Sequence, residues 1–236
     1  MNQVGVKDAA TFRFGVSGYV KPGFEHVLEK YEELFQKEDD NRSQLVVYVG
    51  SEKVIDLFRG MSPESVTNYF SNGKTVAVVC LSSLYDKGLF EYTDPVSKHW
   101  PEFAQNGKEN ITIADVLRHE GGMPRIGDKP LQFNQVTTAE IKKNSIGSIL
   151  EAQKPFFNKE ARREYHTFTK DWITNEIFRR LDPQGRTIAE YIKQDLHSIL
   201  GENGIIIGAS ESDLQNYVQV KDQSGWKTFK DLWTGP

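Results

Sequence analysis

Hydrophobic residues recur at helical spacing in the first clear element of the chain, over residues 21–38. A single stripe with a period of about 3.6 residues is formed by Phe24, Val27, Leu28, Tyr31, Leu34 and Phe35. The stripe predicts an amphipathic helix that packs against a core. Pro22 stands where the first turn of such a helix tolerates proline.

Two short segments rich in β-branched and aromatic residues follow, "QLVVYVG" at 44–50 and "KVIDLFRG" at 53–60. With the short "GSE" turn between them, they predict a β-hairpin. A lone two-stranded hairpin is marginally stable in water. The sheet therefore needs more strands than the pattern clearly supplies, and we expect it to be incomplete.

The remaining pattern is mostly helical. Helices are predicted over residues 71–88, 112–122, 137–153, 165–182 and 186–201. Glycines are expected to end the first of these at Gly88 and the second at Gly121 and Gly122. Thr112 with Asp115 is a plausible N-terminal capping pair. A helix and a small antiparallel sheet followed by a run of helices indicate an α+β fold with a helical subdomain.

Within residues 71–88, one face is expected to be buried and to carry Val76, Val79, Cys80, Ser83 and Leu84. Cys80 is the only cysteine and has apolar neighbours, so it predicts a buried structural thiol. Two tryptophans, Trp100 and Trp172, are expected in the core.

The composition excludes several classes of function. The 236 residues include 38% hydrophobic and 26% charged residues, as in soluble globular proteins, and the net charge of −4 offers no basic field for nucleic acid. No apolar run approaches the length of about 20 residues that a membrane span needs. The N-terminus lacks the pattern of a signal or transit peptide, so a cytoplasmic location is the default expectation. No metal-ligand pattern is present, and no cofactor is expected.

The stretch "NYFSNGKTVAVV", residues 68–79, admits two chemical interpretations. Residues 73–75 match the end of a phosphate-binding loop, whose glycines let backbone N–H groups surround a phosphate. The first glycine of that motif is replaced by Asn68, and Tyr69 and Phe70 would crowd the phosphate. A nucleotide-binding function is therefore disfavoured.

The second interpretation is a Ser-x-x-Lys motif at a helix start, met by Ser71 and Lys74. Three helical positions place both side chains on one face. A lysine near a helix N-terminus and partly buried loses its proton more easily, so it can activate a serine hydroxyl. Alone the motif is weak, because a capping serine and a surface lysine have the same spacing.

The surrounding residues resemble the serine β-lactamase and penicillin-binding-protein superfamily, closest to its class C-like branch with esterases and the β-lactamase-domain proteins of animals. The most specific segment is "LYDKGLFEYTDPVSKHWPEFAQNGKENITIADVLRHEGGMP", residues 84–124. Further similarity extends over about residues 15–210. The resemblance implies a β-lactamase/transpeptidase-like fold and an amide or ester substrate, either a small molecule or a peptide. It implies no oligomeric state.

The resemblance also implies roles for individual residues. Ser71 would be the nucleophile of an acyl-enzyme mechanism, and Lys74 its proton partner. The family's Tyr-x-Asn motif best matches residues 165–167, so Tyr165 would complete the base system. Thr167 replaces the family's asparagine and supplies no amide, which puts substrate preference in doubt. His119, in "RHEGGMP", is expected to have a structural role.

The family's third motif, Lys or His followed by Ser or Thr and then Gly, has no convincing match. The nearest candidates are Lys227-Thr228, which lacks the glycine, and Thr234-Gly235. We therefore expect one β-lactamase-related domain over residues 1–210, a divergent polar tail over residues 211–236, and no C-terminal part of the family's domain, as in a truncated isoform.

Three functions follow as alternatives. The first is a β-lactamase-related serine hydrolase, with low activity expected for this chain because the third motif is missing. The second is a catalytically inactive family member that serves as a binding or scaffold protein. The third is the nucleotide-binding protein already disfavoured.

Overall fold

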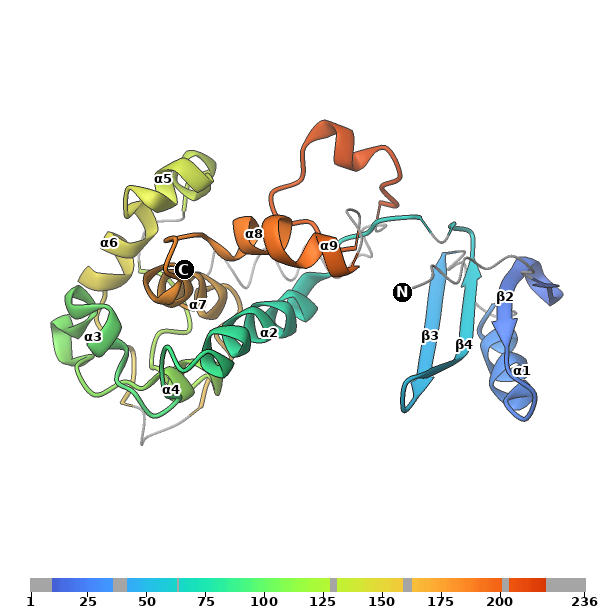
Figure 1. Cartoon of the computed structure of the whole chain (residues 1–236), viewed down its shortest axis with the longest axis horizontal. Coiled ribbons are helices and arrows are strands. Elements are labelled where there is room, and N and C mark those ends of the chain that lie inside the picture. The colour runs from blue at the N-terminus through green and yellow to red at the C-terminus, as the bar shows by residue number, and fades with distance from the viewer. Residues whose placement is uncertain are drawn as a thin grey trace. The chain divides into compact units, whose positions relative to one another are not determined.

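The chain divides into two compact units (Figure 1). The computed structural model describes residues 10–35, 42–62, 64–127, 131–158, 163–200 and 204–219. We name residues 1–68 with 214–236 the sheet unit, and residues 69–213 the helical unit. All the candidate catalytic residues lie in the helical unit.

The sheet unit contains a four-stranded antiparallel sheet in the order β1-β2-β4-β3. Its strands are β1 (Ala10–Thr11), β2 (Val16–Val20), β3 (Ser43–Val49) and β4 (Glu52–Arg59). The predicted hairpin is confirmed as β3 and β4. The sheet contains strands beyond this hairpin, as its stability requires, because β2 pairs with β4 along its whole length.

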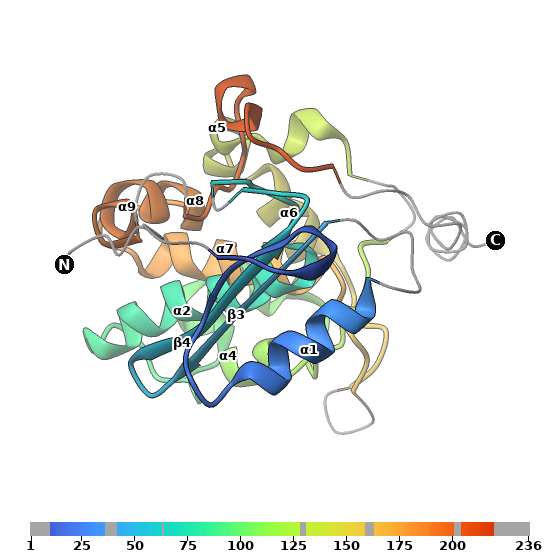
Figure 2. The ribbon, with the colours of Figure 1, turned by 90° about the vertical axis from the view of Figure 1, so that its right-hand side faces the viewer.

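Helix α1 (Glu25–Leu34) lies alongside the strands (Figures 1 and 2). Its hydrophobic side packs with the sheet into a small core around Val16, Ile55 and Leu57. The predicted stripe is confirmed except at Leu34, which is 59% exposed. That residue is the last of the helix.

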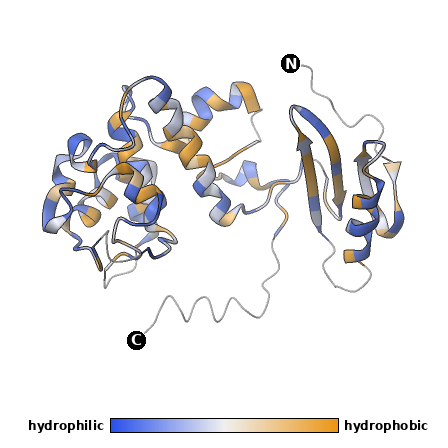
Figure 3. Ribbon diagram, turned by 90° about the horizontal axis from the view of Figure 1, so that it is seen from below, coloured by the Kyte–Doolittle hydropathy of each residue, from blue (hydrophilic) through white to orange (hydrophobic). Residues whose placement is uncertain are grey.

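The helical unit is built from short and medium helices. They are α2 (Gly73–Asp86), α3 (Val96–His99), α4 (Ile113–Leu117), α5 (Thr138–Lys142), α6 (Ser145–Ala152), α7 (Thr169–Leu181), α8 (Ile188–Tyr191) and α9 (His197–Leu200). A π-helical turn joins α8 to α9. Hydrophobic and hydrophilic residues are mixed along these helices (Figure 3). Their hydrophobic residues form one core, in which α2 packs against α7.

Helix α2 presents nearly the expected face to this core. Cys80 and Leu84 are buried and Val76 packs against the core, whereas Val79 is 56% exposed, contrary to the prediction. Ala77 and Leu81 are also buried. Cys80 is buried as predicted, and burial raises the pKa of its thiol to about 11. The helix ends as predicted at Gly88, where the backbone is left-handed and the N–H donates to the carbonyl of Tyr85.

Helix α4 begins at the predicted capping pair, where the Thr112 hydroxyl accepts from the Asp115 N–H and the Asp115 carboxylate accepts from the Thr112 N–H. It ends at Leu117, earlier than the predicted Gly121 and Gly122. His119 takes the left-handed conformation that stops it, with φ of 65°.

The polar segment after Gly208 contains a short 3₁₀ turn at Glu211–Leu214. Within the sheet unit, Tyr217 then forms a parallel bridge with Val66. The third-motif candidates Lys227-Thr228 and Thr234-Gly235 lie outside the described residues. Among the residues that are described, no helix has the length and apolar character to cross a membrane.

Candidate active site

Ser71 lies in a 3₁₀ turn, Phe70–Asn72, directly before α2. Its side chain is exposed. The preceding residue, Phe70, has a φ of 46°, a left-handed conformation that is unfavourable for a bulky side chain. Such strain persists where the surrounding structure enforces it, often at functional positions.

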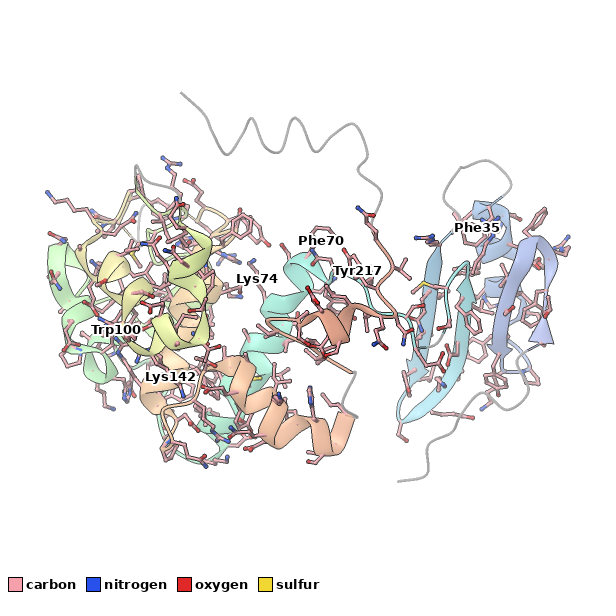
Figure 4. All side chains as sticks on the ribbon, turned by 90° about the horizontal axis from the view of Figure 1, so that it is seen from above. Phe35, Phe70, Lys74, Trp100, Lys142 and Tyr217 are labelled. Atoms are coloured by element: carbon pink, nitrogen blue, oxygen red, sulfur yellow. The ribbon has the colours of Figure 1, made fainter. Side chains whose placement is uncertain are left out.

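Lys74 leaves the first turn of α2 near the N-terminal end of that helix (Figure 4). Its side chain is only 9% exposed. The amine donates to the backbone carbonyl of Thr167 at 2.5 Å and to the Asp171 carboxylate oxygen Oδ2 at 3.1 Å. Lys74 therefore joins α2 to the segment that precedes α7 and to the first turn of α7 itself.

Tyr165 lies beside the same amine. The centre of its ring is 5.2 Å from the Lys74 nitrogen, close enough for a cation–π contact. The other neighbour of the ring is His119, at 4.7 Å between ring centres. Tyr165 is still 48% exposed, so a ligand can reach it.

The structure thus brings Lys74 together with Tyr165 and Thr167, from distant parts of the chain. Ser71 lies near this group because it precedes Lys74 by about one helical turn. Within the described part of the chain, the Ser71 hydroxyl makes no hydrogen bond, and the Lys74 amine is bonded toward α7.

Two histidines hold the segment that carries Tyr165 in place. The backbone N–H of His166 donates to Nδ1 of His119 at 2.9 Å. The His166 ring is fully buried and accepts from the Met123 N–H at its Nε2, so its Nδ1 carries the hydrogen donated to the Glu164 carbonyl. Both rings therefore have fixed tautomers, and they tie Tyr165 to the end of α4.

Burial shapes the electrostatics around the Lys74 amine. Desolvation lowers the pKa of His119 to about 4, with the charge of Lys170 adding to the effect. Desolvation also lowers the pKa of His166 and of Lys170. It raises the pKa of the Asp171 carboxyl, although the hydrogen bond from Lys74 opposes this.

Sequence reasoning missed Asp171, Lys170 and His166. His166 stands between the two expected motif residues, so its position was the one available signal. Asp171 and Lys170 sit in a helix whose pattern is simply amphipathic. Their place beside Lys74 arises from the packing of α2 on α7, which no local pattern encodes. In the described ranges, no group of three or more His, Cys, Asp or Glu is placed to hold a metal.

The fold is that of the β-lactamase/transpeptidase-like proteins. A class C β-lactamase structure overlays with a TM-score of 0.62 at 17% identity, covering 82% of this chain and 53% of that one. The chain belongs to the beta-lactamase family, whose model matches residues 33–233.

More similar proteins include an esterase/beta-lactamase, LipL of Mycobacterium tuberculosis (strain ATCC 25618 / H37Rv). It is 25% identical over 209 residues, or 84% of this chain and 46% of LipL. The crystal structure of a penicillin-binding-protein homologue from Caulobacter crescentus overlays with a TM-score of 0.77 at 27% identity, covering 89% of this chain and 57% of that one.

The structure of EstA from Arthrobacter nitroguajacolicus Rue61a gives a TM-score of 0.74 at 28% identity, over 85% of this chain and 52% of EstA. The chain thus spans about half the length of the relatives that it matches.

Proposed function

We propose that this protein is a serine hydrolase in which Ser71 attacks an ester or amide carbonyl and is acylated. One observation carries the proposal: the Lys74 amine, one turn after an exposed serine, contacts the segment that contains Tyr165 and Thr167. The sequence similarity leads us to expect these two motifs at one site, and they approach each other from positions 93 residues apart.

In the proposed reaction, the Ser71 oxygen forms a bond to the carbonyl carbon while its proton passes to the Lys74 and Tyr165 pair. The tetrahedral intermediate then collapses, the carbon–oxygen or carbon–nitrogen bond of the substrate breaks, and the leaving group takes that proton. Water attacks the acyl-enzyme by the reverse proton path and releases the acid, which regenerates the Ser71 hydroxyl.

Each residue has a role that suits its surroundings. Ser71 is exposed at the start of α2, where the helix dipole stabilises developing negative charge. Lys74 is buried one turn after the serine, and in its neutral form its amine can accept the Ser71 proton. Tyr165 is half exposed beside that amine and can hand a proton to a departing group at the surface.

Esters are the substrate class that we favour. The relatives include an esterase/beta-lactamase and a family VIII carboxylesterase, whose structure is 24% identical with a TM-score of 0.76. Thr167, where the family has asparagine, offers a hydroxyl and no amide. A small ester makes fewer demands on such a side chain than an amide held in a fixed orientation.

The test is hydrolysis of p-nitrophenyl acetate and p-nitrophenyl butyrate by purified protein. We expect turnover that falls at least about 10³-fold in Ser71→Ala and is unchanged in Ser148→Ala. Ser148 is a matched control, because it is also exposed and lies on a helix of the same unit. Equal rates in all three proteins would exclude Ser71 as the nucleophile.

The alternative is a catalytically inactive protein that binds a ligand at this site. The ion pair between Lys74 and Asp171 favours it, because an ammonium group cannot take the serine proton. A cooperatively folded protein with no turnover and no labelling at Ser71 would select this alternative.

A further inference from the structure

Asp171 is the carboxylate that forms an ion pair with Lys74, the proposed base. It lies in the first turn of α7, and its Oδ2 is 3.1 Å from the Lys74 nitrogen. The Lys74 side chain is 9% exposed and the Asp171 side chain 40%. In the part of the chain that the structure describes, no other carboxylate is paired with this amine.

The second carboxylate oxygen of Asp171 reinforces the pairing. Oδ1 is buried and has no hydrogen-bond partner among the described residues. A buried carboxylate oxygen without a partner is unfavourable, and a nearby positive charge is the main compensation. Removing the charge of Lys74 would leave Asp171 uncompensated, so the two residues stabilise each other's ionised forms.

We propose that Asp171 is a positioning residue that holds the Lys74 amine on the α7 side of the site in its ammonium form. An ammonium group cannot accept the proton of Ser71. Asp171 would therefore set the pH above which Ser71 can be acylated. This role in the reaction rests on the proposed function, whereas the control of the Lys74 charge does not.

Other charged and titratable groups face this amine from the elements packed around it. They are Tyr165, whose ring lies beside it, and His119 and Lys170, which interact with its charge. The positive charge of Lys170 disfavours a second ammonium, and His119 is neutral near pH 7. The nearby carboxylates Glu120 and Glu164 are paired with Arg163 and Arg125. Asp171 is thus the charge that favours the ammonium.

The test measures the charge of Lys74 without any need for catalysis. A trace of acetic anhydride acetylates neutral amines and spares ammonium groups, and mass spectrometry reports acetylation at Lys74 relative to Lys142. We compare the wild type with Asp171→Asn, which removes the charge and keeps the shape. The matched control is Asp195→Asn, which breaks an ion pair with Arg186 at a similar exposure of 39%.

At pH 8 we expect acetylation of Lys74 to rise about tenfold in Asp171→Asn, as one unit of pH would produce, and to stay unchanged in Asp195→Asn. The difference should narrow as the pH is raised further, because a rising hydroxide concentration deprotonates the amine in both proteins. Equal labelling at pH 8, including none in either protein, would overturn the proposal. So would a difference that does not narrow as the pH rises, since it would report access rather than charge.

A second readout addresses the reaction. In Asp171→Asn, the acid limb of the pH profile for p-nitrophenyl acetate hydrolysis should move about one unit lower. If acetylation rises in Asp171→Asn but the acid limb does not move, Asp171 controls the charge of Lys74, and that charge does not set the pH dependence of hydrolysis. Absence of turnover in every variant would instead reject the proposed function. The acetylation experiment would still test whether Asp171 controls the charge of Lys74.

Discussion

Three lysines, Lys74, Lys108 and Lys170, are buried among the described residues of the helical unit, and the surroundings of the first two differ in kind. Lys108 has no exposed surface, and its amine donates to three backbone carbonyls, those of Gln105, Glu151 and Gln153. Every proton of that ammonium has a partner, so its role is to tie loops together. Burial lowers the pKa of Lys108 to about 8, because neutral carbonyls only partly replace water.

Lys74 has one carbonyl, one carboxylate and one aromatic ring as neighbours, and it follows an exposed serine by one turn. The comparison teaches that burial alone does not mark a functional lysine. A complete set of backbone acceptors indicates a structural role, whereas charged and titratable neighbours beside an exposed nucleophile indicate chemistry.

The largest expected effect comes from removing the Lys74 amine. In Lys74→Met, acylation by p-nitrophenyl acetate should fall about 10³-fold, the range for loss of a general base. Pre-steady-state release of p-nitrophenol measures the rate. The comparison fails if Lys108→Met slows the acylation of folded protein by as much.

Lys108→Met should instead destabilise the fold. One buried and two partly buried carbonyls would lose their donor, which we expect to reduce the free energy of unfolding by about 3 kcal/mol. Urea denaturation followed by circular dichroism measures this. A change below about 1 kcal/mol would show that the three hydrogen bonds contribute little and that Lys108 is not the structural counterpart of Lys74.

Tyr165→Phe tests whether the aromatic neighbour of Lys74 acts through its hydroxyl, because the variant removes that hydroxyl and keeps the ring that packs on His119. Acylation should fall about 10²-fold through loss of proton transfer, with the melting temperature retained. A wild-type rate in this variant would limit Tyr165 to packing.

His119→Asn tests the neutral histidine of the site, and asparagine tolerates the left-handed backbone at this position. The folded-state pKa of His119 is about 4, below its ordinary value of 6.5. The unfolded chain therefore binds the proton first, and stability is lost as pH falls from about 6.5 to 4.

Between pH 7 and pH 4.5, the wild type should lose about 2 kcal/mol more of its free energy of unfolding than His119→Asn. Urea denaturation of both proteins at each pH provides the difference. Parallel losses in the two proteins would mean that His119 is as easily protonated when folded as when unfolded.

Much of the fold was predictable, because the elements have strong local signals. The stripe of α1, the β-branched and aromatic residues of β3 and β4, the capping pair of α4 and the glycine that ends α2 each indicate their element directly. The resemblance carried by residues 84–124 identified the family, which the family model confirms.

Strand β2 had no such signal. Gly18 interrupts the pattern of "VSGYV" and is conformationally permissive, so the segment does not resemble a strand. The structure supplies the reason for the glycine: a side chain there would place its Cβ 1.9 Å from the Asp56 carbonyl oxygen of β4. A close approach between strands is a tertiary feature that the local pattern does not contain.

The candidate site likewise contains residues that the sequence predicted and residues that it did not. Ser71, Lys74 and Tyr165 were proposed from motifs, and the structure places Lys74 beside Tyr165. Asp171 was not foreseeable, because it lies 97 residues from Lys74 and meets it only when α7 packs against α2. The hydrogen bonds that His119 accepts from the N–H groups of Glu164 and His166 likewise join distant parts of the chain.

The most direct test of the account is the site of covalent labelling. After incubation with a fluorophosphonate probe, intact-mass spectrometry should show one adduct, and peptide mapping should place it on Ser71. The adduct should be absent from Ser71→Ala and strongly reduced in Lys74→Met. An adduct on another residue, or full labelling of Ser71→Ala, would contradict the claim that Ser71 is the nucleophile served by Lys74.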